Sequence, residues 1–123
     1  MGLDLFFLKK KREGKEELGY FRKVNFLVHF FEDRGYEIEN CVPITITKED
    51  AYNLKECCEQ VLGDHRLART YLPTCAGFFF GSTDYDEYYF EDVDRVLDFC
   101  NEMLIPEIEN LEESEEIEFE IWY

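Results

Sequence analysis

Carboxylates and aromatic rings are concentrated between Asp84 and Asp92, and this segment is the strongest candidate for binding or chemistry. Its nine residues include five carboxylates and four rings. The spacing of Asp84, Asp86 and Glu87 offers the hard oxygen ligands that Mg²⁺ or Ca²⁺ prefers. The segment lacks the glycine and the distal glutamate of a calcium-binding EF-hand loop. A divalent-metal site is therefore one hypothesis for this segment, beside the expectation that no metal is bound.

Two other interpretations account for the same residues. Carboxylates in the first turn of a helix interact favourably with its positive end, and Ser82, Thr83 or Asp84 can act as a cap, so the pattern is also typical of a structural helix start. Exposed tyrosines beside carboxylates are typical of a surface that binds Arg or Lys side chains of a protein partner. The residues of that predicted interface are Asp84, Tyr85, Asp86, Glu87 and Tyr88.

A second candidate site consists of the cationic pair Arg22 and Lys23 together with Asn25. A helix is predicted to begin near Tyr20, and cations are unfavourable at the positive N-terminal end of a helix. Something must therefore stabilise the pair. We favour ion pairs with the acidic segment, and the alternative is that the pair binds an anionic ligand.

No other motif in the chain indicates a particular reaction. The sequence contains no phosphate-binding loop and no dinucleotide fingerprint, and the spacing of His29 and His65 shows no catalytic triad. The five cysteines are odd in number and form no CxxC pair, which favours reduced, packed thiols over disulfides or zinc. No catalytic residue is assigned, and the sequence favours a binding protein over an enzyme without deciding between them.

The charge of the chain restricts its partners. The net charge is −16. Residues 1–34 carry eight Lys/Arg and six Asp/Glu, a net charge of +2, whereas residues 35–123 carry five and 23, a net charge of −18. Such a field opposes direct contact with nucleic acid or an anionic membrane and favours a basic protein partner. The sequence has neither a signal-peptide pattern nor a membrane-spanning stretch, so we expect a cytoplasmic protein.

Hydrophobic periodicity predicts the elements that position these residues. At 123 residues, with 46% hydrophobic residues, the chain fits one domain, residues 1–123. Strands are predicted for residues 3–8, 42–47, 78–80 and 117–121. The last strand alternates apolar residues with carboxylates that should face water. Residues 9–18 and 82–88 are predicted as polar loops.

Helices are predicted wherever apolar residues recur at i, i+3, i+4 and i+7. Thr47 followed by Asp50 indicates a capped start for one of them, and Pro106 should kink the last helix or open a new one. The predicted helices are residues 20–34, 48–62, 65–71 and a helix beginning near residue 89. The expected fold is α+β, a small mixed or antiparallel sheet with about three helices packed on one face.

Three strings of residues resemble a family of small uncharacterised proteins from phages, prophages and bacteria. Residues 1–5, MGLDL, are similar to the family's MGLDMYL start, and residues 19–25, GYFRKVN, are similar to its YWRKAN segment. Residues 72–92, LPTCAGFFFGSTDYDEYYFED, are similar to its LPTQSGFFFGSTDYDEYYFED stretch. Phe21 replaces a Trp, and Val28 stands where the family has a His. The resemblance implies a protein of a mobile genetic element and supplies no activity.

The leading hypothesis is a small acidic interaction protein of a phage or mobile element. We expect it to inhibit a basic or nucleic-acid-binding host protein. The alternative is a divalent-metal-dependent enzyme or an anionic-ligand-binding protein that uses the acidic loop. A third hypothesis is an assembly protein in which residues 117–123 pair across a dimer. The oligomeric state is left open.

Overall fold

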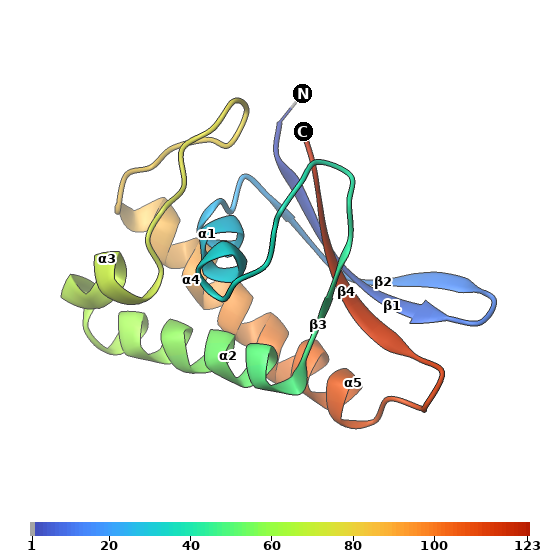
Figure 1. Cartoon of the computed structure of the whole chain (residues 1–123). Coiled ribbons are helices and arrows are strands. Elements are labelled where there is room, and N and C mark those ends of the chain that lie inside the picture. The colour runs from blue at the N-terminus through green and yellow to red at the C-terminus, as the bar shows by residue number, and fades with distance from the viewer. Residues whose placement is uncertain (1) are drawn as a thin grey trace.

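The computed structural model describes residues 2–123 and has one antiparallel sheet. The strand order is β2-β1-β4-β3, and every neighbouring pair is antiparallel. Figure 1 shows the helices on one side of this sheet and the β1–β2 hairpin projecting from the other end of the molecule. The fold is therefore α+β, as predicted. The strands are β1 Asp4–Lys11, β2 Gly14–Arg22, β3 Ile44–Ile46 and β4 Glu116–Trp122.

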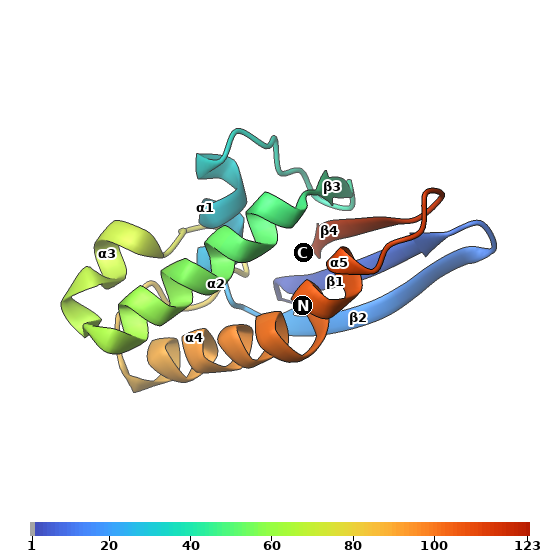
Figure 2. The ribbon, with the colours of Figure 1, turned by 90° about the horizontal axis from the view of Figure 1, so that it is seen from below.

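The helical segments are more numerous than the three expected. Figure 2 shows α2 and α4 lying side by side beneath α1. A π-helical turn, η2, joins α4 to α5, and Pro106 lies in the first turn of α5 as expected. The helices are α1 Phe26–Asp33, α2 Lys48–Gly63, the 3₁₀ turn η1 His65–Leu67, α3 Ala68–Tyr71, α4 Glu87–Phe99, η2 Cys100–Leu104 and α5 Ile105–Glu109. Among residues 2–123 no helix is both long enough and apolar enough to span a bilayer.

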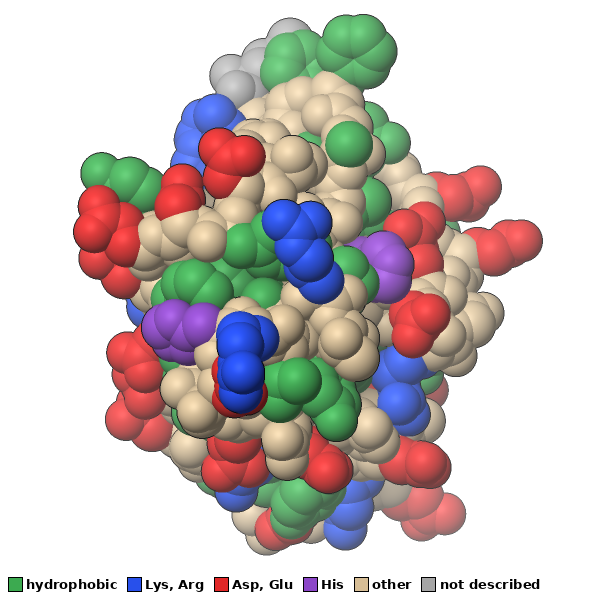
Figure 3. All heavy atoms as spheres, turned by 90° about the vertical axis from the view of Figure 1, so that its left-hand side faces the viewer, with side chains coloured by type: hydrophobic (Ala, Val, Ile, Leu, Met, Phe, Trp, Pro, Cys, Tyr) green, Lys and Arg blue, Asp and Glu red, His purple; other side chains and the backbone are tan. Residues whose placement is uncertain are grey.

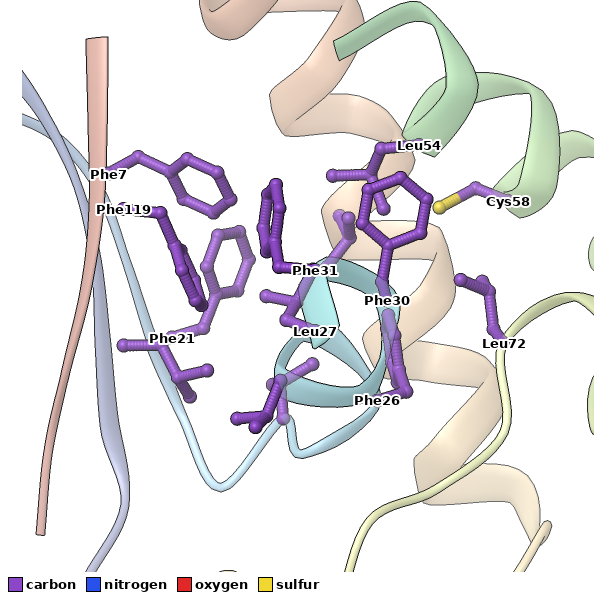
Figure 4. Packing of buried hydrophobic residues seen from close by; sticks show 14 of the residues in the cluster. Phe7, Phe21, Phe26, Leu27, Phe30, Phe31, Leu54, Cys58, Leu72 and Phe119 are labelled. Atoms are coloured by element: carbon purple, nitrogen blue, oxygen red, sulfur yellow. The ribbon is translucent and has the colours of Figure 1, made fainter. Parts of the chain in front are cut away.

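The core between the sheet and the helices is built from aromatic rings. Phe31 of α1 packs on Phe119 of β4 with ring centroids 4.5 Å apart, and Phe7 of β1 lies 4.9 Å from Phe99 of α4. Figure 4 shows Phe7, Phe31 and Phe119 between the strands and α1, with Leu54 and Cys58 of α2 farther from the strands. Burying one such ring contributes about 1.5–3 kcal/mol. Together these contacts fix α1 against the sheet.

The cysteines are free, as the sequence predicted. Cys58 of α2 and Cys100, the first residue of η2, are both fully buried, and burial raises the pKa of Cys100 to about 12. Their thiols are therefore protonated at neutral pH and pack as small hydrophobic groups. Cys41 is exposed, and Cys57 and Cys75 are half-buried.

The prediction of an exposed loop at residues 9–18 is wrong, because these residues form the β1–β2 hairpin. Charged side chains cover both strands. Lys11 pairs with Glu16 at 2.8 Å, and Lys9 reaches Glu107 of α5 at 3.0 Å. Polarity alone suggested a loop, whereas cross-strand and tertiary ion pairs support strands there.

The predicted helix at residues 20–34 begins too early. Tyr20 and Arg22 belong to β2, where they pair with Phe6 and Asp4 of β1. The helix starts at Phe26. Pairing with a distant strand overrides the local helical pattern. Arg22 and Lys23 therefore precede α1 rather than lying in its first turn.

The helix at residues 48–62 is confirmed together with its cap. The Thr47 hydroxyl accepts a hydrogen bond from the backbone N–H of Asp50 at 3.1 Å, and the Thr47 N–H donates to the Asp50 carboxylate at 2.9 Å. These reciprocal bonds form a capping box, which satisfies two of the otherwise unpaired donors at the helix start.

The predicted strand at residues 117–121 is confirmed, with two differences. Glu118 is only 5% exposed rather than facing water freely, and Lys15 Nζ lies 2.7 Å from its carboxylate. β4 also lies between β1 and β3, and Asn40 forms a bridge to Ile121. The edge of β4 is thus occupied on both sides over Ile117–Phe119, so these residues offer no free edge to a second copy.

Candidate functional site

The two candidate segments meet at one cavity of about 240 Å³. It lies where the link between β2 and α1 meets the long loop of residues 72–86 and the first turns of α4. Six of the eight predicted binding residues line it, whereas Tyr85 and Glu87 do not. The predicted binding residues that line the cavity are Arg22, Lys23, Asn25, Asp84, Asp86 and Tyr88.

The side chain of Asn25 is hydrogen-bonded to the backbone of the loop of residues 72–86. Its side-chain N–H groups donate to the carbonyls of Phe80 and Ser82, each at 3.0 Å, and its carbonyl accepts from the Cys75 N–H at 3.0 Å. The residue is 3% exposed and makes no side-chain cap for α1. Its observed hydrogen bonds give Asn25 a positioning role rather than a ligand-binding one.

Tyrosine hydroxyls fasten the two ends of the same loop. The Tyr89 hydroxyl donates to the Leu72 carbonyl at 2.7 Å, and burial raises the pKa of Tyr89, so this donor stays protonated. The Tyr85 hydroxyl accepts from the Thr74 N–H at 3.1 Å. The guanidinium of Arg69 lies 4.6 Å from the centroid of the Tyr85 ring. Tyr85, predicted as an interface residue, is therefore half-buried and engaged within the chain.

The predicted buried strand at residues 78–80 is wrong. Phe78 is 86% exposed at the tip of the loop, and of the three phenylalanines only Phe80 is buried. Phe79 has φ +65° and Gly81 has φ +87°, so the chain turns sharply here. The Phe79 carbonyl accepts from the Leu3 N–H at 2.8 Å. Three consecutive rings resemble a buried strand in the sequence, but the turn points them in different directions.

The structural interpretation of the acidic segment is confirmed in part. Asp86 is the N-cap of α4 and accepts from the Tyr89 N–H at 3.1 Å, and Glu87 lies in the first turn. The capping residue is therefore Asp86, not Ser82, Thr83 or Asp84. The helix begins two residues before the predicted start.

The favoured ion pairing between the two segments is not formed. Within residues 2–123 no carboxylate lies within 4.0 Å of the Arg22 guanidinium or the Lys23 ammonium group. The same part of the chain provides no Lys or Arg partner for Asp84, Asp86 or Glu87. Arg22 and Lys23 therefore line the cavity together with Asp84 and Asp86, but no ion pair joins the two segments within the described residues.

The alternative metal ligands, Asp84, Asp86 and Glu87, do not converge. Among the residues that the structure describes, no three His, Cys, Asp or Glu side chains are grouped so that they could hold a metal ion. The carboxylate of Asp86 is instead directed to the start of α4. The arrangement therefore offers no preformed metal centre.

Asp92, the last residue of the acidic segment, also lines the cavity, although it was not among the predicted binding residues. Burial raises the pKa of its carboxyl group; the positive charge of Arg95 opposes this, and the negative charges of Glu91 and Asp86 add to it. Arg95 donates to Asp92 at 3.0 Å. Tyr88 and Asp92 are four residues apart on α4, and this spacing on one helix face is the signal that could have identified Asp92.

Comparisons of the chain with protein-family models, with curated proteins and with solved structures found no match.

Proposed function

We propose that this chain is an interaction protein that contacts a basic protein partner through the start of α4. One observation carries the proposal: Asp84, Asp86 and Glu87 have no cationic partner among residues 2–123, although all three are exposed. Tyr88, which is 67% exposed, lies beside them. A surface that pairs carboxylates with a rigid ring suits the Arg and Lys side chains of a partner.

The overall charge supports the same partner chemistry. A net charge of −16 accelerates encounter with a positively charged surface and repels nucleic acid. A basic surface is what a nucleic-acid-binding protein exposes. We therefore propose that the chain acts as an inhibitor of such a protein in the cell that carries the mobile element, in line with the resemblance noted above.

The test uses a variant that removes charge and leaves the helix cap intact. Asp84→Asn/Asp86→Asn/Glu87→Gln retains a side-chain oxygen at the N-cap of α4. The matched control is Glu37→Gln/Glu56→Gln/Glu59→Gln, which makes the same change in net charge on another exposed part of the surface.

Tagged wild type and both variants are used to capture partners from host lysate at low and at high salt. We expect one basic protein to be captured by the wild type and by the control, to be lost by the α4 variant, and to be released by salt. Capture that is equal for all three proteins, or that does not change with salt, contradicts the proposal.

A second candidate function is binding of a small anionic ligand. Arg22 and Lys23 line the 240 Å³ cavity without an ion pair in the described chain, which favours this candidate. In one form of this second candidate function, a divalent metal ion binds at Asp86 together with the anionic ligand. The melting temperature should then rise with an anionic ligand or with Mg²⁺ or Ca²⁺, and Arg22→Gln/Lys23→Gln or Asp86→Asn respectively should abolish the rise.

A further inference from the structure

A second cavity, of about 380 Å³, lies between α1, α2 and α3, and it gathers cationic side chains in an otherwise acidic protein. None of the residues that line the first cavity lines this one. Hydrogen-bond donors come to it from α1 and its C-cap and from α3. These donors are His29, Arg34, Arg69, Thr70 and Tyr71.

Arg34 is held rigidly at the wall of this cavity. Its Nε donates to the buried carboxylate of Asp50 at 2.5 Å, and Tyr36 donates to the other oxygen of the same carboxylate. The two Nη groups of Arg34 make no hydrogen bond within residues 2–123. A guanidinium carries five N–H donors in a planar fork, so most of its donors remain available to a ligand.

Arg69 is positioned by a different contact, which also leaves its N–H donors available to a ligand. Its guanidinium lies over the Tyr85 ring, with the central carbon 4.6 Å from the ring centroid. Such stacking uses the face of the guanidinium and leaves its N–H edge free. In the part of the chain that the structure describes, Arg69 has neither an ion pair nor a hydrogen bond.

Two carboxylates lie close to this cavity, and one of them, Asp50, is already paired with Arg34 and does not line the cavity. Asp33 is the one carboxylate among its described lining residues. Cys57 also lines the cavity: burial and the negative charge of Glu56 raise the pKa of its thiol, and Arg34 lowers it, so the thiol is neutral. Figure 3 shows the face with α3, where blue Lys/Arg side chains lie near the centre, purple His side chains lie to either side of them, and red carboxylates lie mostly toward the edges.

We propose that this cavity binds the phosphoryl group of a small phosphate monoester. Two guanidinium groups with unused donors, an imidazole and two hydroxyls offer more donors than the two oxygens of a carboxylate accept. A phosphate dianion has three terminal oxygens and takes such a set. The volume accommodates the phosphoryl group and a small organic part, and Asp33 can accept a hydrogen bond from a hydroxyl of that part.

Histidine NMR tests the proposal with inorganic phosphate as the probe. The chain has two histidines, so the imidazole region contains two sets of signals. His29 lines the cavity, whereas His65 is stacked on Phe90 at 3.7 Å between ring centroids and does not line it. We expect phosphate to shift the His29 signals saturably and to leave His65 unchanged. Sodium chloride at matched ionic strength should have no such effect.

Variants then locate the binding. Arg69→Gln should weaken the apparent affinity about tenfold or more, because hydrogen bonds to charged groups are lost. Arg66→Gln is the matched control, because Arg66 is exposed and already bonded to Asp64. Arg69→Lys keeps the charge but not the fork, and should bind more weakly than the wild type. An unchanged response in Arg69→Gln, or a His29 shift that chloride reproduces, overturns the proposal.

The outcome is independent of the proposed function. The Asp84→Asn/Asp86→Asn/Glu87→Gln variant should keep the phosphate response even if it loses its protein partner. If Arg22→Gln/Lys23→Gln abolishes the response and Arg69→Gln does not, phosphate binds in the first cavity and the present proposal is wrong.

Discussion

Residues 22–25 contact or flank the loop of residues 72–86 in two different ways: one side chain is buried against the loop, and two others are exposed beside it. Asn25 lies beneath and makes three hydrogen bonds to the loop. Arg22 and Lys23 lie within three residues of Asn25 along the chain, are exposed, and form no ion pair within the described residues. A single short segment thus contains both a residue that builds the site and residues that remain available to a partner. Burial, rather than residue type, separates the two roles.

The largest effect should come from the buried member of this comparison. Asn25→Ala removes the partners of two carbonyls and one N–H, and we expect the free energy of unfolding to fall by about 3 kcal/mol. Urea denaturation measures it. Asn101→Ala, at an exposed position, should change the free energy by less than about 0.5 kcal/mol. A similar small change in Asn25→Ala would show that the loop does not depend on this residue.

Asp50 is a second buried polar residue, and unlike Asn25 it carries a charge. Burial alone raises the pKa of its carboxyl group, but hydrogen bonds from Tyr36, the Thr47 backbone and Arg34 together hold the pKa below its usual value. The stabilisation is therefore complete above the unfolded pKa of about 4 and is lost as the pH falls through the lower, folded value. We expect Asp50→Asn to cost about 2 kcal/mol at neutral pH.

The measurement is urea denaturation of wild type and Asp50→Asn over a range of acidic pH. The difference in unfolding free energy between the two proteins should shrink as the pH decreases below about 4. A difference that stays constant with pH would mean that the charge of Asp50 does not contribute.

Lys15 and Glu118 lie between the two extremes, because Lys15 is partly exposed and the carboxylate is buried. Lys15→Ala leaves that carboxylate without its cation, and we expect a loss of about 1 kcal/mol, reduced by solvent screening. Adding Glu118→Gln should recover part of the loss. If the double variant is as unstable as the sum of the two single variants, the two side chains are not coupled.

The smallest effect on stability should come from the exposed carboxylates. Asp84→Asn/Asp86→Asn/Glu87→Gln keeps the cap of α4, and we expect the melting temperature to stay close to that of the wild type, with less than about 0.5 kcal/mol change. Differential scanning calorimetry measures this directly. A large loss would show that these carboxylates support the fold rather than remain available to a partner.

The sequence predicted most reliably those elements whose signals are local. The Thr47 cap of α2 depends on residues three apart, and the alternation of Ile117, Phe119 and Ile121 depends on residues two apart, so both were recognisable. The hairpin was not recognised, because Lys and Glu side chains occupy strands whose support comes from pairing and from α5. The start of α1 was misplaced for the same reason, since Tyr20 pairs with a residue 14 positions earlier.

The sequence identified most of the residues that form the candidate site, but only some of the roles that these residues have. The sequence indicated that residues 22–25 and 84–88 carry the interesting groups, and the structure brings most of them to one cavity. It did not indicate that Asn25 would be buried, because an asparagine is equally compatible with a surface. It also missed the cavity between α1, α2 and α3, whose donors come from residues 29–71 and are adjacent only after folding.

The position of β4 affects how the protein forms during synthesis. Residues 116–122 lie between β1 and β3, so the sheet is incomplete until they leave the ribosome. Until then β1 lacks one neighbour, and Phe31 of α1 and Phe7 of β1 lack their contacts with Phe119. Contacts between such distant segments slow folding. A chain that stops before residue 116 should therefore be a substrate for chaperones and proteases rather than a smaller folded protein.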